Sequence, residues 1–210
     1  VFAITCGVLG SGWFLMGALL NNYLLISQRE LEASRALQQA SSAKYSMFDA
    51  LNQLSLARDN ETGSHILRTQ HYVRVIALAL RDLSMPHASQ LNDETIEAMF
   101  LAAPLHDVGK VGIPDSILLK PGKLTESEWT VMKTHALIGE NVLLSAADEA
   151  GSADLKIAGD LAGGHHEKWN GTGYPRALAG EAIPLSARIM AIADVYDALT
   201  SSRVYKSAWS

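Results

Sequence analysis

The sequence predicts an all-α protein, and three observations support this. No segment shows the strict alternation of apolar and polar residues that is typical of a half-buried strand. Apolar residues instead recur at spacings of three and four, in stretches bounded by glycine, proline or capping residues. No internal repeat is visible, and 48% of the 210 residues are hydrophobic, which is enough for one domain with a real core and additional segments.

The N-terminal segment 1–26 carries no charged residue, and the first charge along the chain is Arg29. About 20 apolar residues cross the hydrocarbon core of a bilayer. Trp13 and Tyr23 are of the residue types that gather at membrane interfaces. We therefore expect a transmembrane helix over 1–26, with a buried helix of a soluble domain or a signal peptide as the alternatives.

Segment 27–45 is predicted to form a helical linker, because neither glycine nor proline occurs between positions 27 and 58. An imperfect heptad seam is typical of a helix that packs on a partner helix, so one hypothesis is a homodimer through this linker. From position 47 onward, packing on the helix's own domain is the preferred alternative. The seam alternates spacings of four and three at Ala33, Leu37, Ala40, Lys44, Met47, Leu51 and Leu54.

Residues 46–210 are predicted to form one helical domain. Thr62 or Ser64 can cap a helix that carries His65 in its first turn. A further helix over 91–105 is expected to deliver His106 and Asp107 at its C-terminal end.

The second half of this domain contains further helix signals. Thr125 and Glu128 have the spacing of a capping box. Helical stretches are expected over 135–147 and 153–163, and Ser186 is the expected cap of a last helix that continues to position 199. The segment 163–184 between them is rich in glycine and proline, and connections of this length are usually functional or mobile.

Histidines and acids gather at the predicted helix ends and glycine-containing loops. Imidazole and carboxylate without thiolate suit iron, manganese, zinc, cobalt or nickel, and the set is too large for one octahedral ion. Two or three metal ions are therefore expected if these side chains converge. The set consists of His65, His106, His135, His165 and His166 with Glu61, Asp107 and Asp194.

Two members of this set have the clearest rationale. Asp107 follows His106 directly and has a second oxygen with which to bridge two cations. Asp194 lies in an apolar helix, where an unpaired carboxylate is costly, so it is expected to face a cation or strong donors. His71 and His87 are interpreted as structural residues.

Charge and cysteine content exclude two classes of protein. The net charge is −5 and no basic run occurs, so polymeric nucleic acid is not an expected partner. Cys6 is the single cysteine, which excludes an internal disulfide framework.

The order of these motifs resembles the HD-GYP family of the HD phosphohydrolase superfamily, from about position 45 to the end. The matching segments are Glu61 to His65, His106 to Lys110, His135, His165 to Glu167, Gly171 to Pro175, and Arg188 to Lys206. Because domains of this family continue through further helices, the resemblance also implies that the domain in this chain is truncated at its C-terminus.

The resemblance implies a bacterial phosphodiesterase that hydrolyses cyclic di-GMP with a metal-bridged hydroxide and yields the linear dinucleotide pGpG, GMP or both. Iron or manganese is the metal that it implies. By motif position, Asp107 is the bridging ligand and acts in catalysis with Lys110. The other implied ligands are Glu61, His65, His106, His135, His165, His166 and Asp194, and the implied substrate contacts are Lys110, Tyr174, Arg203 and Lys206.

Alternative functions stay open at this point. The domain could be a low-turnover sensor or signalling module for cyclic di-GMP, or a related HD hydrolase that acts on another cyclic dinucleotide. A location in the bacterial inner membrane with a cytoplasmic catalytic domain is expected, because cyclic di-GMP is made in the cytoplasm. A partner protein at the Gly171–Pro184 loop is a further hypothesis.

Overall fold

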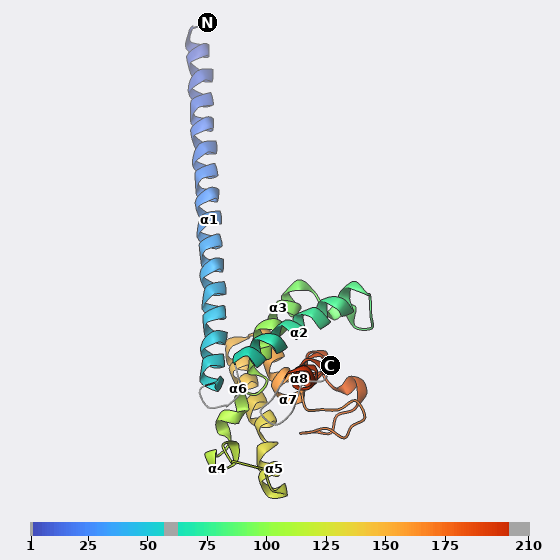
Figure 1. The fold of residues 1–210 in the computed structure, drawn as a ribbon. Coiled ribbons are helices and arrows are strands. Elements are labelled where there is room, and N and C mark those ends of the chain that lie inside the picture. Colours follow the sequence, from blue (N-terminus) through green and yellow to red (C-terminus); the bar gives the residue numbers. More distant parts are fainter. Residues whose placement is uncertain (1, 57–62, 202–210) are drawn as a thin grey trace. The chain divides into compact units, whose positions relative to one another are not determined.

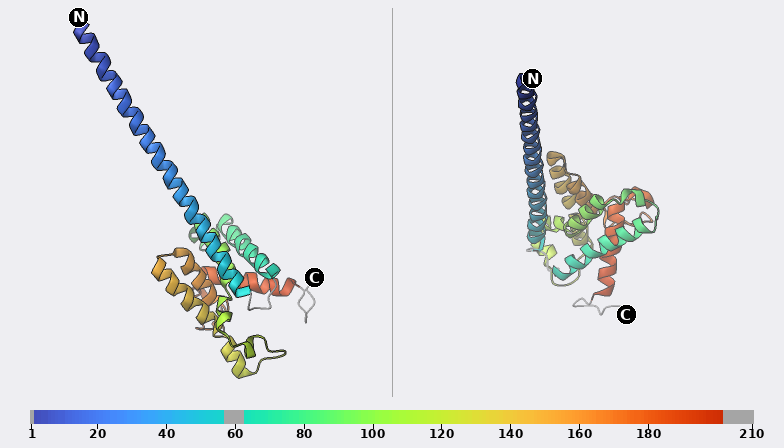
Figure 2. Two further views of the ribbon diagram at one scale, coloured as in Figure 1. Left: turned by 90° about the vertical axis from the view of Figure 1, so that its left-hand side faces the viewer. Right: turned by 90° about the horizontal axis from the view of Figure 1, so that it is seen from above.

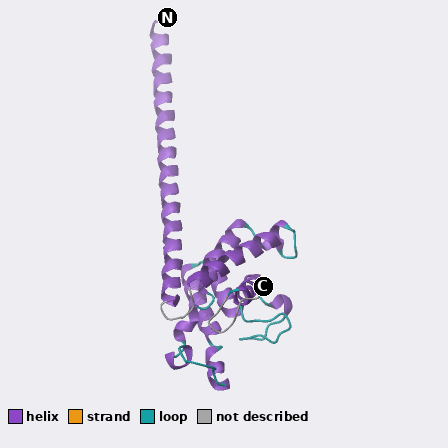
Figure 3. Cartoon of the chain, in the orientation of Figure 1, coloured by secondary structure: helices purple, strands orange, loops and turns teal. Residues whose placement is uncertain are grey.

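The computed structural model describes residues 2–56 and 63–201, and this part of the chain is predominantly helical (Figure 3). Within these ranges no strand is formed, and one isolated antiparallel bridge joins Asn170 and Ala179. The all-α prediction is therefore confirmed for the described residues.

The helices follow one another along the chain, and the longest described connection, residues 165–184, precedes the last helix (Figure 1). Four 3-10 turns lie between them: η1 (Ala88–Gln90), η2 (Ala103–Leu105), η3 (Val108–Gly112) and η4 (Gly180–Ala182). The α-helices are α1 (Phe2–Leu56), α2 (Gly63–Asp82), α3 (Asp93–Ala102), α4 (Asp115–Leu118), α5 (Glu126–Met132), α6 (His135–Ala150), α7 (Ala153–Gly164) and α8 (Leu185–Thr200).

The chain divides into two compact units, Val1–Met47 and Phe48–Ser210. The first unit consists of the larger part of α1, in which Trp13, Leu24 and Leu37 are exposed. None of the helices in the described part combines the length and the apolar character that a membrane span requires. The predicted transmembrane helix at 1–26 is therefore not confirmed.

The second unit has one hydrophobic core, to which α2, α3, α6, α7 and α8 contribute. Helices α6 and α7 lie side by side, and α2 packs on α3 and α8 (Figure 2). Val73, Met99, Leu105, Leu161 and Met190 are fully buried here. Each side chain of this size contributes about 1.5–3 kcal/mol through removal from water, which makes this cluster the main stabilising element.

The last two turns of α1 belong to this core. Phe48 is buried and Leu51 packs against the core, whereas Met47 and Leu54 are exposed. The preferred alternative, that the helix packs on its own domain from position 47 onward, is therefore confirmed, although the buried position is Phe48 rather than the predicted seam residue Met47.

Helix ends test the capping predictions. Thr125 and Glu128 form the predicted capping box at α5, with both reciprocal hydrogen bonds present. The prediction that Ser186 caps the last helix is wrong, because Pro184 occupies the N-cap and Ser186 lies buried in the first turn of α8. Proline fits there because the first helical residues need no N–H donor.

Candidate metal centre

His106 and Asp107 lie between two 3-10 turns. The helix predicted over 91–105 ends at Ala102, and η2 follows with Pro104 inside it. Proline has no N–H to continue the α-helical hydrogen bonds, which explains the change of helix type. The turns bring both side chains into the buried interior of the unit.

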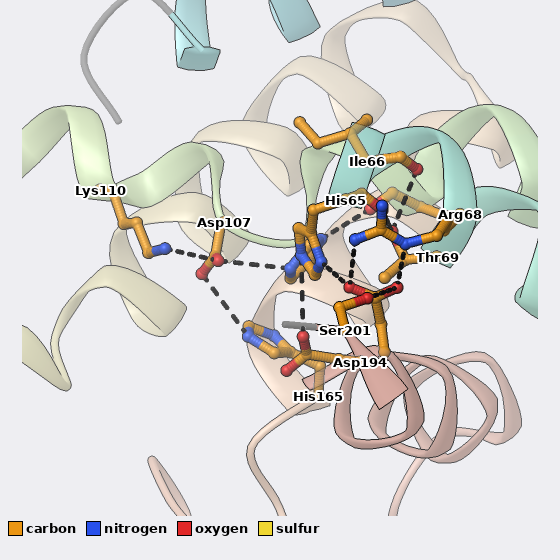
Figure 4. Close-up of polar contacts among 12 residues, drawn as sticks. His65, Ile66, Arg68, Thr69, Asp107, Lys110, His165, Asp194 and Ser201 are labelled. Carbon is orange, nitrogen blue, oxygen red and sulfur yellow. Dashed lines mark hydrogen bonds and ion pairs between the residues drawn. The ribbon is translucent and has the colours of Figure 1, made fainter. Parts of the chain in front are cut away.

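Asp107 lies at the centre of the converging side chains (Figure 4). Its Oδ1 atom is 3.2 Å from Nε2 of His135 and 3.7 Å from Nε2 of His165. Its Oδ2 atom is 3.3 Å from Nε2 of His106 and 2.7 Å from Nζ of Lys110. One oxygen of this carboxylate therefore faces His135 and His165 and the other faces His106, which is the arrangement that a bridging ligand needs.

The candidate ligands form two clusters whose donor atoms lie within 4.8 Å of one another inside each cluster. One cluster contains Asp107, His135, His165 and His166, and the other contains His65, His106 and Asp194. Figure 4 shows that His65 from α2, His165 from the end of α7 and Asp194 from α8 approach the same region. Seven of the eight ligands that the sequence predicted are thereby brought together.

The eighth predicted ligand, Glu61, lies outside the described residues, as do the predicted substrate contacts Arg203 and Lys206. The two histidines that were interpreted as structural lie apart from both clusters. The His71 ring contacts Phe100 at 5.5 Å between centroids, and His87 bonds to Glu181.

Hydrogen bonds to the backbone orient three of the histidine rings. The Nδ1 atoms lie 2.8 Å from the Ala103 carbonyl in His106, 2.6 Å from the Met132 carbonyl in His135, and 3.1 Å from the Leu161 carbonyl in His165. Because a carbonyl oxygen can only accept, each Nδ1 carries the proton and donates it. The lone pair is then on Nε2, which faces the centre in the form that binds metals.

Several buried polar atoms of the centre have no partner. Among the described residues, no hydrogen-bond partner reaches Nε2 of His135, Nε2 of His165 or Oδ1 of Asp107. A buried polar group left in this state costs about 1–3 kcal/mol. Nitrogen and oxygen donors aimed at one point fit divalent metal ions, which would remove this cost.

Charge states in the centre also suit metal ions. Burial raises the pKa of Asp107, but His106 and Lys110 outweigh it, and the pKa lies well below its usual range. Burial lowers the pKa of His165 well below normal and that of His166 to about 3, with neighbouring histidines adding to the effect for His165. At neutral pH the centre therefore offers the ionised Asp107 carboxylate and the neutral imidazoles of His165 and His166.

The loop between α7 and α8 covers one side of the centre. The Tyr174 ring stacks on His166 with 4.6 Å between centroids and an interplanar angle of 29°. Burial raises the pKa of the Tyr174 hydroxyl, so it stays protonated as a donor. The Glu167 carboxylate accepts hydrogen bonds from the backbone N–H of Arg176 at 2.7 Å and of Leu178 at 3.0 Å, which fixes the loop beyond Tyr174.

The sequence did not single out Asp197 as a functional residue. In the structure the residue is 1% exposed, and its Oδ2 atom lies 2.7 Å from Nδ1 of His65. The spacing of three from Asp194 contained the signal, because residues three apart share one face of a helix. Arg68, which bonds to Asp197, was missed as well.

Comparison with known proteins agrees with this geometry. The family model described as HD domain matches residues 65–210. A cyclic di-GMP phosphodiesterase of Vibrio cholerae serotype O1 is 51% identical over 193 residues, which cover 91% of this chain and 39% of the relative. A "Probable cyclic di-GMP phosphodiesterase" of the same organism is 55% identical over 163 residues, covering 77% of this chain and 37% of the relative.

A third relative has a different named substrate. The 3'3'-cGAMP-specific phosphodiesterase 2 of Vibrio cholerae is 44% identical over 154 residues, which cover 73% of this chain and 27% of the relative. The chain thus spans about two fifths, or less, of the length of these relatives. By the match over residues 65–210 and these identities, the chain belongs to the HD domain family, of the HD-GYP type that its motifs resemble.

Proposed function

We propose that this chain carries the catalytic domain of a metal-dependent phosphodiesterase that hydrolyses cyclic di-GMP. One observation carries the proposal: the Asp107 carboxylate lies between two clusters of metal-binding side chains, with the Lys110 ammonium group beside it. The names of the two cyclic di-GMP phosphodiesterases to which the chain is similar support the choice of substrate.

Two groups of residues would hold divalent ions, with Asp107 shared between them. The first is Asp107 with His135, His165 and His166, and the second is His65, His106 and Asp194. Divalent ions bound there would supply Lewis acidity and water of lowered pKa at neutral pH. Iron or manganese is our proposal for the metal, and Glu61 is our proposal for an additional ligand.

The protein's own residues would bind and orient the phosphodiester. Lys110 can donate to a phosphate oxygen and stabilise the negative charge that grows there during hydrolysis. Tyr174 presents a protonated hydroxyl at the wall of the site, and its ring limits the space above His166. Arg203, whose guanidinium group suits bidentate phosphate binding, and Lys206 complete the proposed substrate contacts.

A related substrate is the second candidate. Relatives named as 3'3'-cGAMP-specific phosphodiesterases favour the hypothesis that the domain acts on another cyclic dinucleotide. Both nucleotides contain phosphodiesters that the same ions and Lys110 would contact.

One experiment separates these functions. The full protein would be purified, loaded anaerobically with iron or manganese, and incubated separately with cyclic di-GMP and 3'3'-cGAMP, with products followed by chromatography. We expect faster loss of cyclic di-GMP, to pGpG or GMP. Faster loss of 3'3'-cGAMP would support the second candidate. Binding without loss of either nucleotide would contradict an enzyme and support a sensor.

The context of the domain is also a proposal. We infer from the uncharged sequence of 1–26 a location at the bacterial inner membrane with the catalytic domain in the cytoplasm, which fractionation of the full protein would test. We also propose a homodimer that forms through residues 27–45. A partner protein that binds the Gly171–Pro184 loop is a further proposal. Light scattering of variants with Leu37→Glu in the linker would test the dimer.

A further inference from the structure

Asp197 and Arg68 lie on the Nδ1 side of His65, where Asp197 contacts the ring and Arg68 contacts Asp197. The Asp197 carboxylate is buried and accepts the hydrogen bond of His65 Nδ1 at 2.7 Å. The Arg68 guanidinium donates to both oxygens of this carboxylate, from Nε to Oδ1 at 2.5 Å and from Nη2 to Oδ2 at 3.0 Å. Three side chains therefore form a continuous chain of hydrogen bonds that ends at a candidate metal ligand.

These hydrogen bonds arise because the same residue spacing occurs on two packed helices. His65 and Arg68 are three residues apart on α2, and Asp194 and Asp197 are three residues apart on α8. Residues three apart lie on one helix face. Because α2 packs on α8, each helix supplies one side chain toward the metal centre and one side chain that supports His65.

His65 differs from the other oriented histidines in the nature of its partner. The Nδ1 atoms of His106, His135 and His165 donate to neutral backbone carbonyls, whereas Nδ1 of His65 donates to a carboxylate. The Arg68 guanidinium donates to both oxygens of Asp197 and so stabilises this carboxylate in its charged form. An anionic acceptor makes the opposite ring nitrogen a stronger ligand than a neutral acceptor does.

We propose that Asp197, held in place by Arg68, is a positioning residue that strengthens divalent-metal binding specifically in the cluster of His65, His106 and Asp194. The carboxylate keeps the proton of His65 on Nδ1 and leaves Nε2 as the donor toward the ion. This inference rests on the proposed metal centre. It adds that the metal affinity of one cluster depends on the ion pair of Arg68 and Asp197 more strongly than that of the other cluster does.

Two variants interrupt the chain of hydrogen bonds at different places. Asp197→Asn keeps the shape of the side chain and an acceptor oxygen but removes the negative charge. Arg68→Gln leaves the carboxylate without its guanidinium. Matched controls are Arg74→Gln and Glu97→Gln, which break an ion pair that also joins α2 to a neighbouring helix and whose two members are not candidate ligands. Arg68 and Arg74 are similarly exposed, at 36% and 33% of their side chains.

The measurement is a Mn²⁺ titration of the metal-free full protein, with free Mn²⁺ quantified by electron paramagnetic resonance. For the wild type and both controls we expect at least two bound ions per chain. For Asp197→Asn we expect one ion to bind about 10- to 100-fold more weakly while the other is unchanged, which is the usual effect of losing such a partner. Arg68→Gln should weaken the same ion.

A second readout detects the position of the proton directly. In metal-free protein with ¹⁵N-labelled histidine, the long-range proton–nitrogen spectrum of His65 should show protonated Nδ1 in the wild type. Asp197→Asn should increase the share of protonated Nε2, whereas Glu97→Gln should not change it.

Each outcome decides a different claim. Failure of the wild type to bind Mn²⁺ would overturn the metal centre itself. Normal metal binding in the wild type together with unchanged binding and an unchanged His65 spectrum in Asp197→Asn would overturn only the inference about Asp197. Equal weakening of both ions, or loss of the near-ultraviolet circular dichroism signal, would assign Asp197 a general structural role and overturn its specificity for one cluster.

Discussion

The Nζ atom of Lys110 lies 2.7 Å from Oδ2 of Asp107, one turn further along the chain in η3. The bridging candidate therefore has a fixed cation beside it, on the side of the carboxylate that also faces His106. A lysine has no lone pair for a metal while it is charged, so this group can act on the substrate without being a ligand. Metal binding and phosphate binding can thus be separated by mutation.

Lys110→Met should keep the metal content of the wild type and lower kcat. Loss of one positioned donor to the charge that develops in the transition state costs about 10² to 10³ in rate. Steady-state hydrolysis of cyclic di-GMP and metal analysis of the same sample provide the measurements. The control is Lys156→Met, an exposed lysine of α7 that should leave both values unchanged. Loss of metal in Lys110→Met would contradict the separation.

Asp107→Ala should abolish turnover and bound metal together, because it removes a carboxylate whose two oxygens face His135 and His106. His71→Ala should leave both nearly unchanged, since His71 lies on an exposed position of α2 against Phe100. Elemental analysis after dialysis would measure the bound metal of both variants, and hydrolysis of cyclic di-GMP would measure their turnover. Loss of metal in His71→Ala would show that the assignment of the histidines is wrong.

Gly109→Ala should destabilise the domain. A Cβ atom at this position would lie 1.9 Å from the carbonyl oxygen of His135 and 2.5 Å from the backbone nitrogen of Gly139, so η3 and α6 would have to separate. We expect a loss of more than about 3 kcal/mol in the free energy of unfolding, as for severe overpacking. Denaturant unfolding would measure it.

Gly17→Ala is the control for this substitution, because nothing lies within 4 Å of a Cβ added in that part of α1. The unfolding midpoint of the domain should stay at the wild-type value in this variant. A midpoint for Gly109→Ala equal to that of Gly17→Ala would contradict the close approach of the two backbones.

Glu167→Gln should loosen the loop that carries Tyr174. The neutral amide offers one acceptor oxygen in place of the two that now receive the N–H groups of Arg176 and Leu178. Amide hydrogen exchange at these two residues should therefore accelerate. Glu181→Gln is the matched control, since Glu181 lies in the same loop and its carboxylate bonds to the His87 side chain. Equal exchange in the two variants would contradict this role.

Glu128 should titrate far below an ordinary glutamate. Hydrogen bonds from Lys120, at 2.8 and 2.6 Å, and from the Thr125 N–H hold the pKa of Glu128 at about 2, below the ordinary value of 4.5 for a glutamate. Because the folded-state pKa is depressed, the contribution to stability is complete above about pH 4.5 and is lost as the pH falls toward 2. Carbon-13 NMR titration of the Glu128 carboxyl would measure it, and Lys120→Met should raise the pKa.

Much of the fold could be predicted from the sequence because helix signals are local. The capping box at Thr125 and Glu128 needs only residues three apart, and the structure contains both of its hydrogen bonds. Ser186 shows where this reasoning fails, because Pro184, two residues earlier, occupies the N-cap and Ser186 lies inside the first turn of α8.

For the candidate site, the sequence predicted which side chains take part but not the role of each one. Residue type identified the imidazoles and carboxylates that can bind divalent ions, and the structure brings His65, His106 and His135 together with the rest of the described set. Spacing alone could not rank Asp194 against Asp197. Both lie in one apolar helix, and the packing of α2 on α8 determines which carboxylate meets Nδ1 of His65 and which lies on its Nε2 side.

The sequence by itself determined the helical class, most helix positions and the chemistry of the metal-binding side chains, since these depend on periodicity, caps and donor atoms. Only the tertiary structure decided that the two oxygens of Asp107 face different imidazoles, and that Arg68 and Asp197 support His65. Hydrogen bonds between residues more than a hundred positions apart depend on how the helices pack, which no local pattern encodes.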